Sequence, residues 1–121
     1  MLLITAFLPN TVQAALDTLT YAEKEYLAQK KEITMCIDPK WMPYEKIENG
    51  KHIGMSADYM ALFSKMLDVP IKLIPTSTWS ESIAYAKARK CDIFSLAMST
   101  HDRLSYMDFT TPYLSMPLVI A

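Results

Sequence analysis

The chain has 121 residues, a formal net charge of −1 at pH 7, and 51% hydrophobic against 21% charged residues, a balance that predicts one modest globular domain with a single core. The near-neutral charge and the absence of any Lys/Arg cluster longer than a pair argue against a nucleic-acid partner. With only two glycines there is little room for a phosphate-binding loop, and no metal-ligand spacing is present, so we expect neither cofactor nor metal.

Residues 1–14 are predicted to be a secretory signal peptide. The apolar run 2–9 is too brief to span a bilayer, and small residues follow it where a signal peptidase would cut. No Lys or Arg precedes the run, so a truncated start or a buried hydrophobic arm is the alternative. We therefore expect an exported, periplasmic protein.

A lead-in helix is predicted within residues 15–32, because Thr20 and Glu23 have the spacing of a capping box. The β-branched, apolar run 33–37 then predicts a strand that ends at the turn signal Asp38-Pro39.

The next elements are a hairpin and an amphipathic helix. Asn49-Gly50 predicts a tight hairpin turn within residues 44–53, because both residues tolerate positive φ. Apolar residues then recur at spacings of three and four, which predicts a helix with Ser56 as N-cap that ends before Pro70.

Residues 71–74 predict a second strand, the capping-box spacing of Thr78 and Glu81 predicts a helix to about Lys90, and residues 91–97 predict a third strand. This alternation indicates the α/β class, with a mostly parallel sheet covered by helices on both faces. A short polar helix over 101–106 follows. The apolar strand predicted over 117–121 either pairs back onto the sheet or belongs to a longer protein.

Two cysteines, Cys36 and Cys91, are an even number in a chain predicted to be exported, so a disulfide is one possibility. We prefer two small buried residues without a bridge. Cys36 falls late in its predicted strand and Cys91 at the start of another, so in parallel strands their Cα atoms would be too far apart.

Candidate binding residues follow each of the three predicted parallel strands, where ligands bind in open α/β sheets. An arginine fork matches a carboxylate, an indole offers an apolar wall, and an acid accepts a bond from an amine. The bland alternatives are an ion pair of Arg103 with Asp102 or Asp108, packing of Trp41 under the hairpin, and a turn cap by Asp38. The candidates are Asp38, Trp41, Tyr44, Thr78, Trp79, Ala97, Met98, Ser99 and Arg103.

Over residues 20–121 the chain resembles the family 3 extracellular solute-binding proteins, in particular modules fused to bacterial histidine kinases and diguanylate cyclases. The resemblance rests on Asp38-Pro-Lys-Trp41-Met-Pro-Tyr44-Glu45, Gly54 before Asp58-Tyr59, Trp79-Ser80-Glu81, Cys91-Asp92-Ile93, Thr100-His-Asp-Arg103 and Phe109-Thr110-Thr-Pro112-Tyr113.

This resemblance implies a type II periplasmic-binding-protein fold, in which two α/β lobes close on a ligand such as an amino acid. Residues 33–121 would then be the incomplete N-terminal part of lobe one, a solute-binding domain with half a cleft that binds weakly or not at all alone. It also implies that Arg103 binds the ligand carboxylate, Trp41 forms the aromatic wall, and Asp38 the polar floor.

Two further positions depart from the family pattern. The family offers a hydroxyl or backbone donor shortly before the arginine, and that position is Met98, or Ser99 with a one-residue deletion, which leaves the ligand class open. Arg89 and Lys90 stand where the family commonly has a glycine, so the preceding helix is expected to end differently.

The expected function is recognition of a small carboxylate-bearing solute, with a membrane sensor or an importer permease as partner. One alternative is an enzyme of the same fold, either a cyclohexadienyl or arogenate-type dehydratase or a module fused to a lytic transglycosylase. His52 and His101 are expected to be solvated surface residues without partners, so no catalytic residue is predicted. A non-binding truncated fragment is the third alternative.

Overall fold

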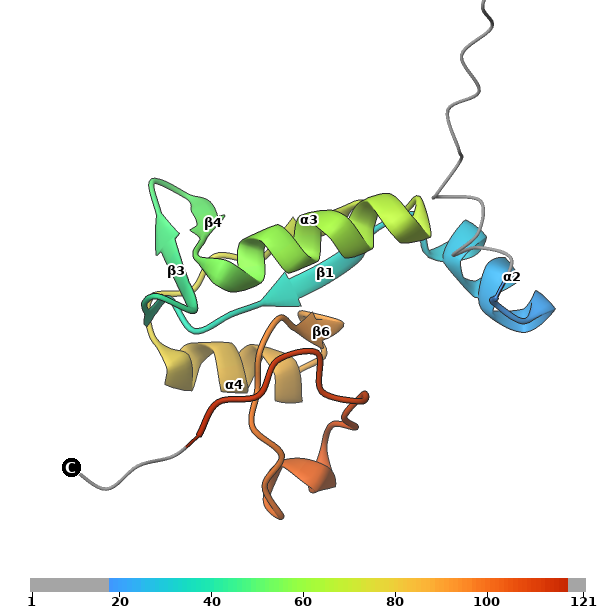
Figure 1. Ribbon diagram of the computed structural model, residues 1–121. Coiled ribbons are helices and arrows are strands. Elements are labelled where there is room, and N and C mark those ends of the chain that lie inside the picture. The colour runs from blue at the N-terminus through green and yellow to red at the C-terminus, as the bar shows by residue number, and fades with distance from the viewer. Residues whose placement is uncertain (1–17, 118–121) are drawn as a thin grey trace, which may run out of the picture.

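The structure is a computed structural model that describes residues 18–117 (Figure 1). The predicted signal peptide, the start of the predicted lead-in segment and residues 118–121 of the predicted last strand lie outside this range. None of the helices within residues 18–117 is long and apolar enough to cross a membrane.

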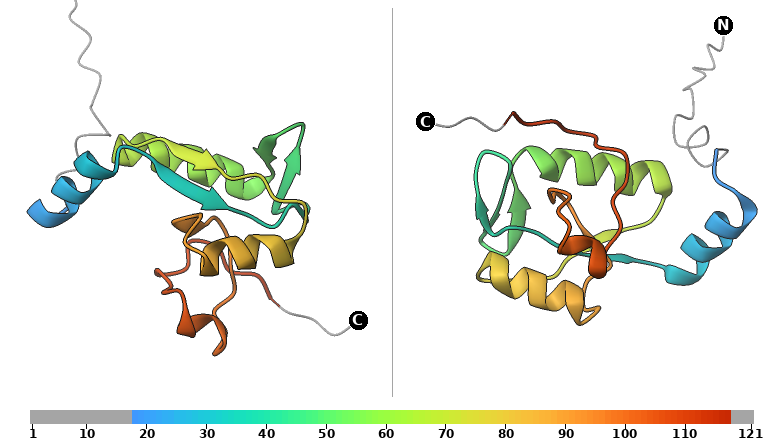
Figure 2. Two further views of the ribbon diagram at one scale, coloured as in Figure 1. Left: turned by 180° about the vertical axis from the view of Figure 1, so that it is seen from behind. Right: turned by 90° about the horizontal axis from the view of Figure 1, so that it is seen from below.

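The lead-in helix α2 (Tyr21–Lys30) begins at the predicted capping box. The Thr20 hydroxyl accepts from the Glu23 amide at 3.3 Å, and the Glu23 carboxylate accepts from the Thr20 amide at 2.7 Å. No residue of α2 is buried, and the helix extends away from the other elements (Figures 1 and 2). A bond of 2.7 Å from Lys30 Nζ to Asp92 Oδ1 ties its end to the domain.

The main sheet is parallel, as predicted, with strand order β5 (Ile71–Leu73), β1 (Ile33–Cys36), β6 (Ile93–Phe94). Helices α3 (Met55–Leu67) and α4 (Trp79–Lys87) cover opposite faces of this sheet (Figures 1 and 2). The α/β prediction is therefore confirmed. Under α3, the core gathers Met35, Ile37 and Met60, and the partly buried hydrophobic residues packed on it include Tyr59, Phe63 and Tyr113.

Strand β6 is much shorter than the predicted 91–97, because the chain bends on both sides of it. On one side the Asp92 carboxylate turns to accept from the Thr34 amide at 2.8 Å. On the other side Ser95 is buried and donates its hydroxyl to Glu45. The backbone amides of Asp92 and Ser95 still donate to the carbonyls of Thr34 (2.8 Å) and Cys36 (3.4 Å), so the segment stays beside β1 although only two of its residues are a strand.

The predicted hairpin consists of β3 (Glu45–Glu48) and β4 (Lys51–Ile53), and its turn residues Asn49 and Gly50 have φ of 51° and 73°. This is the paired positive φ that the Asn-Gly signal predicts. A two-residue strand that was not predicted, β2 (Lys40–Trp41), pairs with β3 and completes a small antiparallel sheet.

The N-cap predicted for α3 is wrong. The cap is Gly54, and Ser56 is a fully buried residue of the first turn. The Met55 and Ser56 amides donate to the carbonyls of Pro43 (3.0 Å) and Tyr44 (2.9 Å). Because the loop before β3 already satisfies these first amides, no capping side chain is needed.

Helix α4 begins at its predicted cap, where the Thr78 hydroxyl accepts from the Glu81 amide at 3.1 Å. It ends at Lys87, earlier than predicted, and Arg89 itself adopts the positive φ of 57° that a glycine would provide. The buried Ser82 hydroxyl donates to the Ile37 carbonyl at 2.7 Å, which fixes α4 to the end of β1.

The prediction of two unbridged cysteines is wrong, because Cys36 and Cys91 form a disulfide with Cα atoms 5.7 Å apart. Cys91 precedes β6, and the chain bends at Asp92 between them. The offset expected between two extended strands therefore does not apply.

After the sheet, the predicted helix over 101–106 is a single 3₁₀ turn, η1 (Arg103–Ser105). The segment 108–117 forms no strand. It returns to the core through Tyr113, whose ring lies 4.8 Å from that of Tyr59 and 5.4 Å from that of Phe63 between centroids.

Candidate functional site

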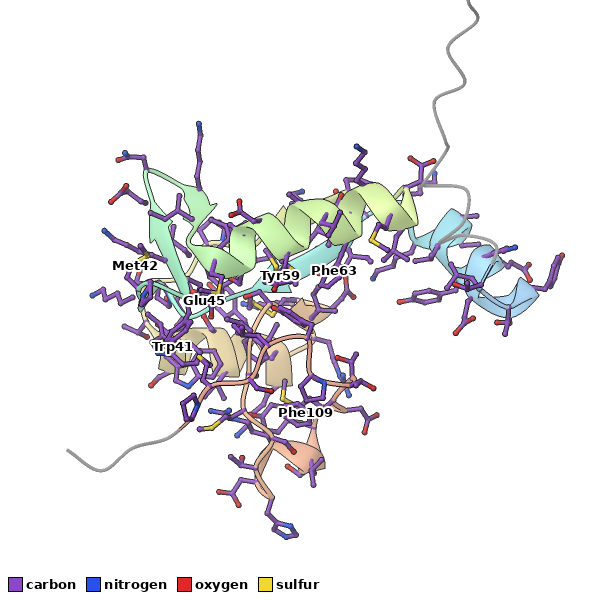
Figure 3. All side chains as sticks on the ribbon, in the orientation of Figure 1. Trp41, Met42, Glu45, Tyr59, Phe63 and Phe109 are labelled. Atoms are coloured by element: carbon purple, nitrogen blue, oxygen red, sulfur yellow. A yellow bond between two sulfur atoms is a disulfide. The ribbon has the colours of Figure 1, made fainter. Side chains whose placement is uncertain are left out.

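The candidate residues lie on the segments that follow β1, β5 and β6, whose carboxyl ends open at one edge of the sheet. The start of α4 lies at the same edge, through its bond to Ile37. Trp41 and Glu45 lie beyond the end of β1 (Figure 3). The topology therefore gathers the predicted residues at one end of the domain.

Arg103, Trp79 and Met98 form one contact group. The Arg103 guanidinium carbon lies 5.2 Å from the Trp79 ring centroid, and its Nη1 donates to the Met98 carbonyl at 2.7 Å. Trp79 in turn packs on Phe94 with centroids 5.0 Å apart. Stacking and one hydrogen bond hold the guanidinium plane and leave other N–H groups to bind an anion.

The ion-pair alternative for Arg103 is wrong within residues 18–117, because neither Asp102 nor Asp108 pairs with it there. The residue is half-buried, and its guanidinium contacts the neutral Trp79 ring and Met98 carbonyl. Its positive charge is therefore not paired with a carboxylate among these residues.

Asp38, Trp41 and Tyr44 form a second group. The Trp41 and Tyr44 rings lie 5.1 Å apart, and both residues are half-buried. Asp38 Oδ1 accepts from the Lys40 amide at 2.9 Å, so Asp38 does cap its turn, as the alternative reading had it.

No hydrogen bond, ion pair or ring contact joins these two groups in the part of the chain described. The remaining candidates are Thr78, Ala97 and Ser99. Thr78 is exposed and acts as the N-cap of α4, Ala97 is half-buried, and Ser99 is exposed, as is the side chain of Met98.

Glu45 was not predicted, yet its carboxylate accepts hydrogen bonds from three different segments at this edge. It is 0% exposed, and its Oε1 accepts from the Asp38 amide at 2.7 Å. Its Oε2 accepts from Ser56 Oγ at 3.1 Å and from Ser95 Oγ. Burial raises the pKa of Glu45, against the lowering effect of these hydrogen bonds. The sequence signal that could have predicted the burial of Glu45 is strand alternation, which puts Glu45 on the same face of its strand as Ile47, a residue packed against the core.

The prediction that His52 is solvated and unpartnered is wrong. Its side chain is 9% exposed, and its Nε2 lies 2.8 Å from Ser56 Oγ and 3.9 Å from Glu45 Oε2. Burial lowers the pKa of His52. The chain turn at Gly54 creates this contact. His101 is exposed, as predicted.

The Ser56, His52 and Glu45 side chains do not form a nucleophilic triad. Ser56 is fully buried, and its hydroxyl lies between the carboxylate and the imidazole. Within residues 18–117 there is also no cluster of three side chains that could hold a metal ion.

Comparison with known proteins identifies a family and a fold. The family model for bacterial extracellular solute-binding proteins, family 3, matches residues 33–121. No curated protein sequence matches the chain significantly.

Three solved structures illustrate the likeness, each below 25% identity. The periplasmic domain of B. pertussis BvgS superposes with a TM-score of 0.74 at 18% identity, over 80% of this chain and 19% of that one. An arginine-bound mutant of domain 1 from TmArgBP superposes with a TM-score of 0.60 at 21% identity, over 75% of this chain and 71% of that one. An ancestral cyclohexadienyl dehydratase superposes with a TM-score of 0.61 at 20% identity, over 82% of this chain and 42% of that one. The fold is thus part of a type II periplasmic binding protein, and the chain spans about a fifth of the BvgS domain.

Proposed function

The chain belongs to the family 3 bacterial extracellular solute-binding proteins, and from this we propose that it binds a small, carboxylate-bearing solute in the periplasm. The binding surface is the edge of the sheet where the segments after β1, β5 and β6 meet. An amino acid is the proposed solute class, and two of the similar structures support it, because they are arginine-bound proteins.

The observation that carries this proposal is the environment of Arg103. Its guanidinium is oriented by Trp79 and the Met98 carbonyl, and no carboxylate within residues 18–117 neutralises it. A fork-shaped cation that is fixed but unpaired matches a ligand carboxylate. Trp41 and Tyr44 supply an aromatic wall, and Asp38 an acceptor for the ligand amine.

We propose that the chain supplies one jaw of a two-jaw cleft and therefore binds weakly alone. It covers 42% of the ancestral dehydratase and 19% of the BvgS domain, so a full-length relative has much more surface around its ligand. A ligand that touches one lobe leaves most of its surface in water. A membrane sensor or an importer permease is the proposed partner, and the reading frame downstream would distinguish the two.

We do not propose catalysis, although a dehydratase shares the fold. His52 is buried against Ser56, and His101 is exposed on the turn before Arg103. Neither histidine contacts Asp38, Trp41, Trp79 or Arg103 in the described residues.

The test is a titration of the ¹⁵N-labelled chain with pooled L-amino acids, followed by NMR. Arg103→Lys keeps the charge but removes the planar fork, and should weaken binding about tenfold or more, as expected for loss of a charged hydrogen bond. Arg89→Lys is the matched control, since Arg89 is exposed beyond the far end of α4. Equal shifts in wild type and Arg103→Lys would refute the role of Arg103.

Micromolar binding by the wild-type chain would refute a different part of the proposal. It would mean that one jaw buries enough of the ligand, against the expectation of weak binding.

A further inference from the structure

We propose that Glu45 is a positioning residue of the candidate site: through a reversible hydrogen-bond chain with Ser56 and His52, it makes the anchoring of the segments after β1 and β6 depend on pH. The consequence for ligand binding rests on the function proposed above. The device itself rests on contacts within the ligand-free chain.

Glu45 joins three parts of the fold at one buried carboxylate. The Asp38 amide, just after β1, donates to Oε1 at 2.7 Å. Ser56, from the first turn of α3, donates to Oε2 at 3.1 Å, and Ser95, just after β6, donates to the same oxygen. Asp38 and Ser95 begin the two segments that carry Trp41 and Arg103. The carboxylate therefore holds both halves of the candidate site.

The Ser56 hydroxyl connects Glu45 to His52, whose Nε2 lies 2.8 Å away. A hydroxyl has a single hydrogen, so it donates to one neighbour and accepts from the other. With Glu45 ionised, His52 Nε2–H donates to Ser56, and Ser56 donates to Glu45. With Glu45 protonated, its O–H donates to Ser56, and Ser56 donates to the unprotonated Nε2 of the other tautomer.

All three side chains keep a hydrogen bond in both protonation states of Glu45. The hydrogen-bond chain can therefore take up a proton at Glu45 without creating a buried unsatisfied group. This feature separates the group from an ordinary buried acid, for which protonation strands a donor or an acceptor. The proton reaches Glu45 from solvent, and the accompanying change at His52 is a tautomer shift that leaves the imidazole neutral.

Protonation nevertheless weakens the anchors. The bonds from the Asp38 amide and the Ser95 hydroxyl are charge-assisted while Glu45 is ionised, and neutral bonds are about half as strong. Both segments loosen together, and a negative charge next to Asp38 disappears. A ligand amine near Asp38 would lose part of its electrostatic attraction in the same step.

The groups that face Glu45 set the pH range. Asp38 disfavours its ionisation by charge repulsion, and Glu45 in turn disfavours ionisation of Tyr113, whose hydroxyl donates to the Ser95 carbonyl. Burial, the largest cause, and the repulsion from Glu45 and Tyr59 together raise the pKa of Tyr113 to about 12, so Tyr113 stays neutral. On the hairpin, Lys46 pairs with Glu48 at 2.8 Å. No lysine or arginine of residues 18–117 pairs with Glu45.

The direction in which stability changes with pH follows from the pKa shifts that burial causes in Glu45 and His52. The pKa of Glu45 is raised from 4.5 and that of His52 lowered from 6.5, so the pH range in which Glu45 takes up its proton is shifted upward. Folded Glu45 binds its proton more tightly than unfolded Glu45, so its contribution to stability grows as pH falls through this range. His52 contributes in the opposite sense below its ordinary pKa. The expected response at Asp38 is therefore a local loosening and not acid unfolding.

The test uses the full 121-residue chain without ligand. The ¹³C resonance of the Glu45 carboxyl and the amide resonances of Asp38 and Ser95 are followed by NMR between pH about 4.5 and 6.5, the range bounded by the ordinary values of the two groups. We expect one shared midpoint for all three. Glu45→Gln should flatten the Asp38 and Ser95 titrations, and His52→Gln should shift the midpoint in Glu45.

His101→Gln, a change at an exposed histidine, is the matched control and should leave the shared midpoint in place. If Glu45→Gln fails to fold, the wild-type comparison of the carboxyl with the two amides still decides. Amides that titrate apart from the carboxyl would overturn the inference, and so would a Glu45→Gln chain that keeps the wild-type profile. Because no ligand is present, failure here leaves the Arg103 titration unaffected, and failure of ligand binding leaves this test intact.

Discussion

Reduction of the disulfide between Cys36 and Cys91 should lower the free energy of unfolding by about 4 kcal/mol, the chain-entropy value for closing a loop of this length. The bridge links residues 55 apart in sequence and joins the end of β1 to the residue that leads into β6. Small domains have a total stability of only about 5–15 kcal/mol. Urea unfolding monitored by circular dichroism, with and without reductant, measures the difference.

The double variant Cys36→Ala, Cys91→Ala is the control for side effects of the reductant. Both cysteines are buried, so the variant should unfold at low urea and should not respond to reductant. A wild-type midpoint that reductant leaves unchanged would show that the bridge contributes nothing to the fold.

Of the alanine substitutions at the two glycines, Gly54→Ala should lower the free energy of unfolding more. The expected loss is about 3 kcal/mol, the upper end of the cost of a strained backbone position. Gly54 has a φ of 105°, and an added Cβ would lie 2.7 Å from the Tyr44 carbonyl oxygen and 2.9 Å from Glu45 Cα. These are backbone atoms, so a side-chain rotation cannot relieve the clash. Thermal or urea unfolding measures the loss.

Gly50→Ala separates the clash from the backbone strain. Gly50 also has positive φ, at 73°, but its added Cβ would meet nothing within 4 Å. Its expected loss is about 1 kcal/mol, the lower end of the cost of a left-handed residue. If the two variants lost the same stability, the close approach of Gly54 to the start of β3 would not matter to the fold.

Much of the fold follows from local signals in the sequence. The Thr20 and Thr78 caps and the Asn49-Gly50 turn were predictable because a few neighbouring residues determine each one. The start of α3 was not, because carbonyls of Pro43 and Tyr44 replace the side-chain cap. A cap made by backbone carbonyls does not depend on the side chains of the helix, so the helix sequence cannot indicate it.

The candidate site divides in the same way. Arg103 and Trp79 could be predicted from their residue types and their places after parallel strands, and the structure brings them together. The disulfide and the buried partners of Glu45 could not. They depend on a bend at Asp92 and on side chains from β4, α3 and the end of β6, which the topology brings together only in three dimensions.

The most direct test of the central claim is the resonance of the Arg103 Nε–H group, followed by NMR while the ¹⁵N-labelled chain is titrated with pooled L-amino acids and, separately, with their amides. Arg103 should shift with the acids and not with the amides, because only the carboxylate accepts two bonds from the guanidinium. The exposed Arg89 should not shift with either. An Arg103 signal that does not move, or that moves equally with acids and amides, would contradict the proposal that this residue binds the solute carboxylate.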